Sequence, residues 1–399
     1  MTNEELEPER QKRLSAARRV VIKLGTSVVT GAGSAVCAER IEPLVRSIGA
    51  LKRANRQVVL VSSGAVGLGA GRLGLHHSRL QDVVVRQACA AVGQSMLMHA
   101  YEQMFGLHDV KIAQVLLTED DFTDFRRYTN LRRTMEKLLK LGVLPIINEN
   151  DTVSTSELEY GQSSAASGQE RVFGDNDRLA ALVMSKLEAD ALVLLTNVDG
   201  VLLHKPKALS PGKSEEAVPI PLIEEITEEL KTVAEGPSAG GRGGMLTKLE
   251  AAQIAMQSGG ICIIANGKTP DILDRIVAGE HIGTMFMSTS RMAGKRRWIT
   301  YAAGVRGRVI VNEGARVAIM GGKASLLASG VVRVEQQFAP QDVVSIADCD
   351  GREFARGIIN CASEEAARLI EGISPHQVGE RGRVLVTRDN LVLSPACTA

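Results

Sequence analysis

Aromatic side chains are scarce in this chain, which has one Trp, four Tyr and seven Phe among its 399 residues. A sequence this poor in aromatics shows no stacking platform of the kind that holds the bases of single-stranded nucleic acid. Cysteine is also scarce: the chain has six, which lie far apart, and none of them forms a CxxC pair. This spacing indicates reduced, mostly buried thiols and argues against a disulfide framework or a zinc site.

Long hydrophobic runs are missing as well, since no apolar stretch approaches the ~18 residues that span a bilayer. The acidic start, Glu4–Glu7 (EELE), is unlike a signal peptide. Neither charge sign predominates: 47 basic and 46 acidic residues give a formal net charge of +1. That balance argues against a chain dedicated as a whole to nucleic acid. We therefore expect a soluble, cytoplasmic protein with no membrane segment.

What the chain does contain is an alternation of apolar runs with helix-length segments, as far as about residue 280. The runs that predict strands are Arg19–Leu24, Gln57–Ser62, Lys111–Leu117, Val143–Asn148, Ala191–Thr196 and Ile261–Ala265. The segments that predict helices are Glu39–Asn55, Asp82–Phe105, Asp124–Leu141, Asp175–Leu187 and Met245–Ser258. Apolar strands without strict alternation, separated by helices, indicate an α/β fold with an open, mostly parallel sheet between layers of helices.

The pattern changes after about residue 300, where short alternating or glycine-interrupted runs predominate. The runs that predict strands here are Gly307–Val311, Ala315–Met320, Gly330–Val334, Val343–Ile346, Phe354–Ile359 and Val384–Val386, with one helix at Ser363–Ile370. This pattern is typical of a small β-barrel-like domain. We expect a tail over residues 1–17, a first domain over 18–288, a linker over 289–303 and a second domain over 304–390.

Two predicted strands of the first domain end in residues suited to an anion site. The first runs into Lys23–Ser27 (KLGTS), which places an ammonium group beside a glycine. The second runs into Ser62–Ala65 (SSGA), a small polar turn that lets backbone amides approach a ligand closely. In a P-loop the lysine closes the glycine-rich loop, whereas Lys23 precedes its glycine. A phosphate site here would therefore have another design.

Three further segments add polar groups at the same predicted edge of the sheet. Asn148–Asp151 (NEND) follows a strand and suits the ammonium group of an amino acid. Gly174–Asp177 (GDND) begins a helix, where Asp175 or a neighbour would be a natural N-cap. Gly240–Gly244 (GGRGG) precedes a helix with Lys248 in its first turn, which is a second phosphate-binding design.

Each segment by itself has a simpler interpretation. Lys23 alone would be a solvated lysine, Asn148–Asp151 a hydrophilic loop, Asp175–Asp177 a helix cap and Gly240–Gly244 a flexible linker. Their convergence favours a functional site over these simpler interpretations, because right-handed crossovers bring all of these strand ends to one edge. Two lysines, glycine-rich turns and a cluster of acidic and amide groups at one edge match the needs of phosphoryl transfer.

Several other motifs in the sequence are misplaced or incomplete. Gly69–Gly74 fits GxGxxG but begins well after its strand ends, so a dinucleotide site is not expected. Gly267–Thr269 and Gly212–Ser214 resemble the end of a P-loop, but the glycine required five residues earlier is Cys262 in one case and Lys207 in the other. The seven histidines show no HExxH or other metal-binding spacing, which argues against a zinc-dependent hydrolase.

Five motifs together resemble the glutamate 5-kinase family of the amino-acid kinase superfamily. They are Val21–Ser27 (VIKLGTS), Ser62–Ala65 (SSGA), Ile147–Asp151 (INEND), Phe173–Asp177 (FGDND) and Gly243–Lys248 (GGMLTK). The resemblance covers nearly the whole chain, and from Gly307 onward it is to a PUA domain. It implies the amino-acid kinase fold for the first domain and transfer of the ATP γ-phosphoryl group to the γ-carboxylate of L-glutamate, the first step of proline biosynthesis.

The resemblance also implies a role for individual residues. Lys23 would contact the transferring phosphoryl group, Lys248 would contact the β/γ bridge, and Asp177 would orient both lysines. Ser63, Asp151 and Asn176 would hold glutamate, with Asp151 pairing the α-ammonium group, while Gly25 and Gly64 would allow close backbone approach. The nucleotide would be lined by Lys23, Gly25, Thr196, Asn197, Arg242, Gly243, Gly244, Met245, Leu246, Thr247 and Lys248. Mg²⁺ would arrive with ATP and bridge its phosphates, without a protein metal cage.

The chain departs from the family pattern in three places. Gly161–Glu170 (GQSSAASGQE) lengthens the loop between two substrate motifs, Arg242 stands where a small Thr is common, and Leu246 replaces an expected Ser. We interpret Arg242 as a further phosphate contact. The partners that the family implies are proline as feedback inhibitor, further copies in a dimer or tetramer, and γ-glutamyl phosphate reductase.

Two alternatives stay open at this point. The chain would be another carboxylate kinase of the same superfamily, or an RNA-interacting protein that uses its PUA domain while the kinase fold serves as a sensor. Basic residues for phosphate contacts are available near and within the second domain, namely Lys295, Arg296, Arg297, Arg306 and Arg308. The near-zero net charge favours a basic linker and surface over an RNA site.

Overall fold

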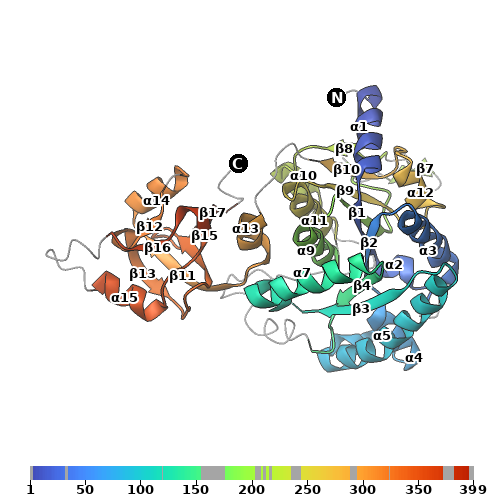
Figure 1. Ribbon diagram of the computed structural model, residues 1–399, viewed down its shortest axis with the longest axis horizontal. Coiled ribbons are helices and arrows are strands. Elements are labelled where there is room, and N and C mark those ends of the chain that lie inside the picture. Colours follow the sequence, from blue (N-terminus) through green and yellow to red (C-terminus); the bar gives the residue numbers. More distant parts are fainter. Residues whose placement is uncertain are drawn as a thin grey trace. The chain divides into compact units, whose positions relative to one another are not determined.

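A computed structural model describes residues 3–31, 35–118, 120–153, 176–202, 208–209, 213–214, 218–234, 244–287, 294–322, 324–371 and 382–394 (Figure 1). The chain divides into two compact units. The first comprises Met1–Asp121 and Arg126–Arg291, and the second comprises Phe122–Phe125 and Met292–Ala399.

The first unit is built on an eight-stranded sheet with the order β3-β4-β2-β1-β5-β9-β10-β8. Its pairs are parallel except for β10, which runs antiparallel to β9. The strands are β1 (Arg19–Leu24), β2 (Gln57–Ser62), β3 (Ile112–Leu117), β4 (Leu144–Glu149), β5 (Ala191–Thr196), β8 (Leu222–Ile223), β9 (Ile261–Asn266) and β10 (Thr284–Met287), besides a separate short pair, β6 (Ala208–Leu209) and β7 (Lys213–Ser214). The prediction of an open, mostly parallel sheet is confirmed.

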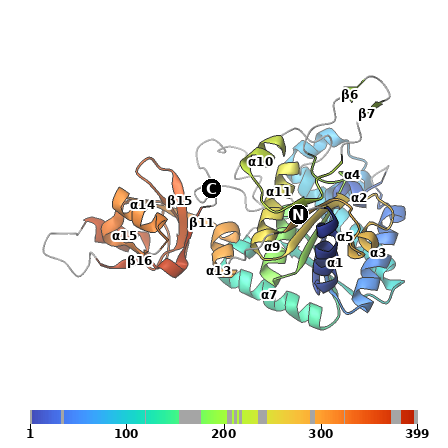
Figure 2. The ribbon, with the colours of Figure 1, turned by 90° about the horizontal axis from the view of Figure 1, so that it is seen from above.

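Helices cover both faces of this sheet, as Figures 1 and 2 show. The helical elements of the unit are α1 (Asn3–Ala16), α2 (Thr26–Val29), α3 (Ala38–Arg53), α4 (Ala65–Arg72), η2 (His77–Gln81), α5 (Val83–Gly106), α6 (Asp120–Thr123), α7 (Phe125–Lys140), α9 (Asn176–Leu187), α10 (Glu228–Ala234), α11 (Met245–Gln257) and α12 (Ile272–Val277), although α6 and the first residue of α7 belong partly to the second unit. Helices α9 and α11 pack against the central strands on one face, and α3 and α12 lie on the other.

The alternation of side chains along β1 determines which face of the sheet each of them reaches. Val20, Ile22 and Leu24 belong to the core cluster shared with α3, α5 and α12. Because successive side chains of a strand point to opposite faces, Val21 and Lys23 point to the other face, where α9 contacts β1. Lys23, which follows three apolar residues of β1, is thereby directed at the beginning of α9.

Glycines allow α4 and α5 to approach backbone to backbone. A Cβ atom on Gly69 would lie 1.8 Å from the carbonyl oxygen of Cys89, and one on Gly93 would lie 1.8 Å from that of Ala65. Both separations are far below van der Waals contact, so no other residue fits at either position without moving a helix. This packing gives a structural reason for Gly69, which begins the GxGxxG pattern of the sequence.

Residues 1–17, which we expected to be a tail, contain helix α1. The Arg10 side chain is buried, and its Nη2 atom donates to the carbonyl oxygen of Ile282 at 2.5 Å. Burial lowers the pKa of the Arg10 guanidinium to about 10. A buried arginine and the apolar residues Leu14 and Ala17 attach α1 to the body of the unit.

The second unit contains a five-stranded sheet with the order β13-β11-β14-β15-β17 and a two-stranded pair, β12 and β16. Apart from the parallel pair β11–β14, the neighbours run antiparallel. Its elements are α13 (Gly294–Arg297), the π-helix η3 (Trp298–Ala302), β11 (Val305–Val311), α14 (Glu313–Met320), β12 (Leu326–Leu327), η4 (Ala328–Gly330), β13 (Val331–Glu335), β14 (Val343–Ala347), β15 (Glu353–Ile358), α15 (Ser363–Glu371), β16 (Val384–Val386), η5 (Arg388–Asn390) and β17 (Leu391–Leu393).

One prediction for this unit is wrong. Ala315–Met320, interpreted as a β run, belongs to the helix α14. The side-chain oxygen of Asn312 accepts a hydrogen bond from the backbone N–H of Ala315 at 2.9 Å, which is an N-cap that starts a helix. The apolar residues of ARVAIM fit either structure, and the cap decides between them.

Among the described residues, none of the helices combines the length and the apolar character that crossing a bilayer requires.

Candidate active site

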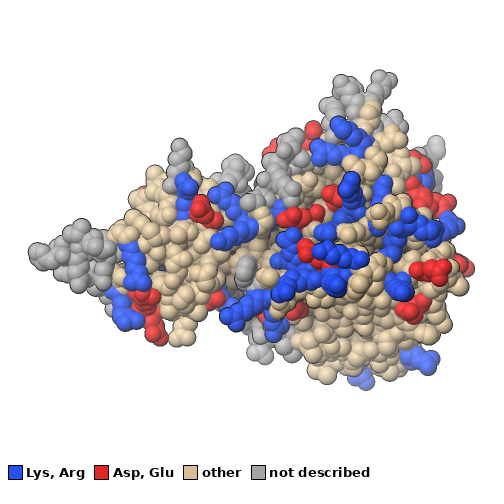
Figure 3. Space-filling view, in the orientation of Figure 1, with Lys and Arg blue, Asp and Glu red and all other residues tan. Residues whose placement is uncertain are grey.

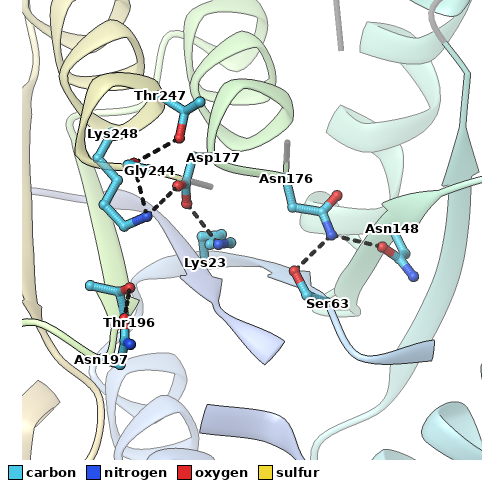
Figure 4. Close-up of polar contacts among 10 residues, drawn as sticks. All are labelled: Lys23, Ser63, Asn148, Asn176, Asp177, Thr196, Asn197, Gly244, Thr247 and Lys248. Atoms are coloured by element: carbon cyan, nitrogen blue, oxygen red, sulfur yellow. Dashed lines mark hydrogen bonds and ion pairs between the residues drawn. The ribbon is translucent and has the colours of Figure 1, made fainter. Parts of the chain in front are cut away.

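Two lysines from different elements meet at one carboxylate. Lys23 is the fifth residue of β1, Lys248 lies in the first turn of α11, and Asp177 is the second residue of α9. The Nζ atom of Lys23 lies 2.7 Å from Oδ1 of Asp177, and Lys248 Nζ lies 3.0 Å from Oδ2 (Figure 4). Lys248 Nζ also donates to the carbonyl oxygen of Gly244 at 3.4 Å. The structure therefore brings together the three residues predicted to perform the chemistry.

Burial strengthens the electrostatics of this triad. Asp177 has no exposed surface, and each lysine side chain is only 6% exposed. Burial by itself would raise the pKa of the Asp177 carboxyl. The two ammonium groups outweigh that effect and lower its pKa to about 2. With the carboxyl ionised and both lysines protonated, the triad carries a net charge of +1 in a largely water-excluded place, which favours an anion such as a phosphoryl group.

Asn176, the neighbour of Asp177, connects this triad to a second set of polar groups. Its Nδ2 atom donates to Ser63 Oγ at 2.8 Å and to Asn148 Oδ1 at 3.0 Å (Figure 4). These two bonds use both hydrogens of the Asn176 amide, so its Oδ1 remains as an acceptor. Asn148 in turn donates through Nδ2 to Gln94 Oε1 at 2.9 Å. The strand ends of β2 and β4 are thus joined to the start of α9.

Two glycines keep the site open. Gly25 follows β1 with an ordinary φ of −71°, but a Cβ atom there would lie 3.3 Å from the carbonyl oxygen of Leu195 and 3.7 Å from Lys23 Nζ. Gly64 follows Ser63 with φ of +109°, in the left-handed region that favours glycine. A side chain at Gly25 would press on the carbonyl oxygen of Leu195 beside the Lys23 ammonium group, and one at Gly64 would strain the turn that holds Ser63.

Asp151 lies in the turn that follows β4 and is half-buried. The backbone N–H of Asn150 donates to the carbonyl oxygen of Leu117 at 2.7 Å, and the Thr152 hydroxyl donates to Asn150 Oδ1 at 2.5 Å. These bonds fix the turn at the edge that also carries Asn148.

The predicted nucleotide residues lie at the ends of β5 and α11. Thr196 closes β5 and its hydroxyl donates to Asn197 Oδ1 at 3.3 Å. Gly244 is the N-cap of α11 and makes no side-chain cap, so the first amides of this helix, at Met245 and Leu246, form its positive end. The Thr247 hydroxyl donates to the carbonyl oxygen of Gly244 at 3.0 Å. Arg242 and Gly243 lie outside the described residues, as do Asp175 and the Gly161–Glu170 loop.

Sequence reasoning missed Gln94. It lies in the middle of α5, is 8% exposed and reaches Asn148 from a helix far away in the sequence. A signal was present: a long amide side chain next to Gly93, inside a segment otherwise made of small and apolar residues. Nothing in the sequence alone indicated that this amide faces the end of β4.

The chemistry of the donor set bears on the expected metal. Among the residues that the structure describes, no three His, Cys, Asp or Glu side chains gather as metal ligands would. Asp177 is already paired with two lysines. This set fits Mg²⁺ that is held mainly by nucleotide phosphates and water, since Mg²⁺ commonly keeps several waters and takes few protein carboxylates.

Known proteins resemble this chain along most of its length. Residues 18–266 match the model of the amino acid kinase family, and residues 307–376 match that of the PUA domain. The glutamate 5-kinase of Moorella thermoacetica is 42% identical over 390 residues, covering 95% of this chain and 97% of that protein. That of Caldanaerobacter subterraneus subsp. tengcongensis is 40% identical over 382 residues, covering 94% and 97%. That of Myxococcus xanthus is 42% identical over 358 residues, covering 89% and 90%.

Proposed function

The chain belongs to the amino acid kinase family, and we propose that it is a glutamate 5-kinase. It transfers the γ-phosphoryl group of ATP to the γ-carboxylate of L-glutamate, which gives ADP and γ-glutamyl phosphate. The observation that carries the proposal is the adjacency of Asn176 and Asp177. One residue is hydrogen-bonded to Ser63 and the other is paired with two buried lysines, so both substrates of a phosphoryl transfer would meet at the start of α9.

A carboxylate nucleophile is already ionised near pH 7 and needs no general base. Catalysis then depends on positioning and on stabilising the charge of the transferring group. Lys23 and Lys248 supply that charge, and Asp177 keeps the two ammonium groups side by side in spite of their repulsion. Mg²⁺ bound with ATP would neutralise part of the phosphate charge. The amide end of α11 would support the phosphates.

The pocket around Asn176 is suited to a zwitterion. Asn176 Oδ1 is an acceptor for an ammonium group, and Asp151 adds a negative charge at the same edge. The hydroxyl of Ser63 accepts from Asn176, so its own hydrogen points elsewhere and serves a carboxylate. A phosphate group in place of the ammonium group would require cations there instead.

The test is formation of an acyl phosphate, trapped as the hydroxamate, with ATP and Mg²⁺. L-Glutamate, L-aspartate and N-acetyl-L-glutamate are compared as acceptors. Turnover on free L-glutamate alone supports the proposal, because the N-acetyl compound has no ammonium group. Turnover on N-acetyl-L-glutamate or L-aspartate in preference to L-glutamate would identify another carboxylate kinase of the same superfamily.

Further partners belong to the same proposal. L-Proline as feedback inhibitor is tested by adding it to this assay, and a dimer or tetramer by light scattering of the purified chain. The acyl phosphate product is reactive towards water, so its consumer would be a reductase that takes it up rapidly. γ-Glutamyl phosphate reductase has that chemistry, and co-purification tests the pairing.

The RNA alternative is weakened at two of its five predicted contacts. Arg297 is only 3% exposed and Arg308 lies 4.0 Å from Glu335, whereas Lys295, Arg296 and Arg306 are exposed. Basic side chains gather instead over α7 in Figure 3, where the helix carries six Lys and Arg against one Glu. RNA binding that is weak and insensitive to salt would count against the alternative in both units.

A further inference from the structure

We propose that Gln94 is a positioning residue of the amino-acid pocket. By accepting the hydrogen bond of Asn148, it sets the orientation of two amides, so that Asn176 presents an acceptor to the ammonium group of the substrate. Gln94 acts only through Asn148 and does not touch the substrate. The inference rests on the proposed function, because it assigns the pocket to a zwitterionic amino acid.

The argument begins with the polarity of a carboxamide. Its oxygen accepts and its nitrogen donates, while the two ends have nearly the same shape, so the partners decide which end points where. Gln94 Oε1 receives Asn148 Nδ2 at 2.9 Å, and this turns Asn148 Oδ1 towards Asn176. Asn176 must then offer Nδ2 to Asn148, and its Oδ1 is left for a ligand.

The reverse arrangement would have a different specificity. If Asn148 turned its nitrogen towards Asn176, two N–H donors would face each other unless Asn176 also turned. Asn176 would then present its NH₂ group to the pocket, which repels an ammonium group and attracts a carboxylate. The acceptor at Gln94 therefore determines whether the pocket recognises a positively or a negatively charged group.

The hydrogen bonds from Gln94 through Asn148 to Asn176 begin at two buried amides, which have little freedom to turn over. Gln94 is 8% exposed and Asn148 is 3% exposed. If one partner of a buried hydrogen bond is removed, the other keeps its desolvation penalty and gains little from solvent. Asn148 without Gln94 would consequently give up its present orientation rather than hold it against an apolar neighbour.

Helix α5 is held in the position that these hydrogen bonds require. The close contact of Gly93 with the carbonyl oxygen of Ala65 fixes α5 against the start of α4, directly after the Ser63 turn. Two turns further along, the hydroxyl of Tyr101 lies 2.8 Å from Ser62 Oγ, and both groups are buried. One face of α5 thus supports the end of β2 through Tyr101 and the end of β4 through Gln94.

The experiment compares three variants in the full-length enzyme. Gln94→Leu removes the acceptor at similar volume, and Gln94→Glu keeps an acceptor that cannot offer the amide's N–H. Ser95→Ala is the matched control, since the Ser95 hydroxyl on the same helix is exposed and donates only to the carbonyl oxygen of Val92. Steady-state constants for L-glutamate and ATP are measured, together with the relative turnover of L-glutamate and glutarate, which lacks the ammonium group.

We expect Gln94→Leu to raise KM for L-glutamate about tenfold, which corresponds to one lost buried hydrogen bond, and to change KM for ATP less than about twofold. Its preference for L-glutamate over glutarate should fall. Gln94→Glu and Ser95→Ala should stay within about threefold of the wild type in all constants. Rescue by Glu is a result that a merely space-filling role of Gln94 does not predict.

Two results overturn the inference. One is an unchanged KM for L-glutamate in Gln94→Leu, and the other is equal damage in Gln94→Leu and Gln94→Glu. If Gln94→Leu does not fold, the ratio of L-glutamate to glutarate turnover in Gln94→Glu decides, because a fixed acceptor must preserve or increase it. Wild-type turnover on L-glutamate is measured first. Its absence would refute the proposed function, whereas its presence with unaffected variants would refute only the role of Gln94.

Discussion

Oδ1 of Asp177 forms an ion pair with Lys23 Nζ at 2.7 Å, and its other oxygen, Oδ2, accepts a hydrogen bond from Lys248 Nζ at 3.0 Å. One buried carboxylate therefore offsets the repulsion between two ammonium groups that lie close together. This relationship explains why the site can hold two lysines before any phosphate arrives, and it leads to the first three predictions.

Asp177→Asn preserves the shape of the side chain and removes its charge. The lysines are then left buried without a counter-charge, so we expect a loss of about 3–5 kcal/mol in the free energy of unfolding. We also expect a fall in kcat of at least about a hundredfold, since the donors are no longer held in place. Urea unfolding and steady-state kinetics measure the two effects. A variant with wild-type stability and turnover would remove Asp177 from this role.

Lys248→Ala separates catalysis from amino-acid binding. Lys248 lies at the start of α11, the end proposed for the nucleotide, and its Nζ atom donates to Asp177 Oδ2 and to the carbonyl oxygen of Gly244. Its charge matters most when the phosphoryl group is in transit, so kcat should fall by about a hundredfold or more while KM for L-glutamate changes less than about threefold. An unchanged kcat would exclude Lys248 from the mechanism.

The lowered pKa of Asp177 predicts how stability depends on acid. The carboxyl has a pKa of about 2 in the folded protein against an ordinary value of about 3.9 in an unfolded chain. The ionised form therefore stabilises the folded state fully above pH ~4, and this contribution of roughly 2 kcal/mol is lost as the pH falls towards 2. The measurement is the difference in urea midpoint between the wild type and Asp177→Asn, at pH 6 and at pH 3. The difference should shrink in acid, and a constant difference would contradict the assignment.

Much of the fold was predictable because its strands are short apolar runs with clear ends. The predicted bounds of β1, β2 and β5 coincide with the observed ones. Prediction failed where local pattern allowed two structures, as at Ala315–Met320, where the Asn312 cap selects a helix. It also failed at residues 1–17, since the burial of Arg10 depends on a surface made by distant parts of the chain.

The site shows the same division between local and distant information. Lys23, Ser63, Asn176, Asp177 and Lys248 lie beside strand or helix ends, where the sequence marks them with glycine, and the structure brings them to one edge. Gln94 lies in the middle of a helix and not at an end, and its partner Asn148 is 54 positions away. The role of a buried amide within a helix can be recognised only from its contacts in the folded structure.

Gly64 and Gly74 offer a matched pair for the last prediction. Both have positive φ, +109° and +64°, but a Cβ atom on Gly64 would lie 3.1 Å from Val29 Cγ1, whereas one on Gly74 meets nothing within 4 Å. Changing either to Ala should cost about 1–2 kcal/mol of unfolding free energy from backbone strain. Gly64→Ala should in addition raise KM for L-glutamate several-fold, since relief of the crowding shifts Ser63 away from Asn176. Urea unfolding and KM measured on both variants separate the two effects. Equal KM values would show that the turn tolerates a side chain and that Ser63 is positioned by other contacts.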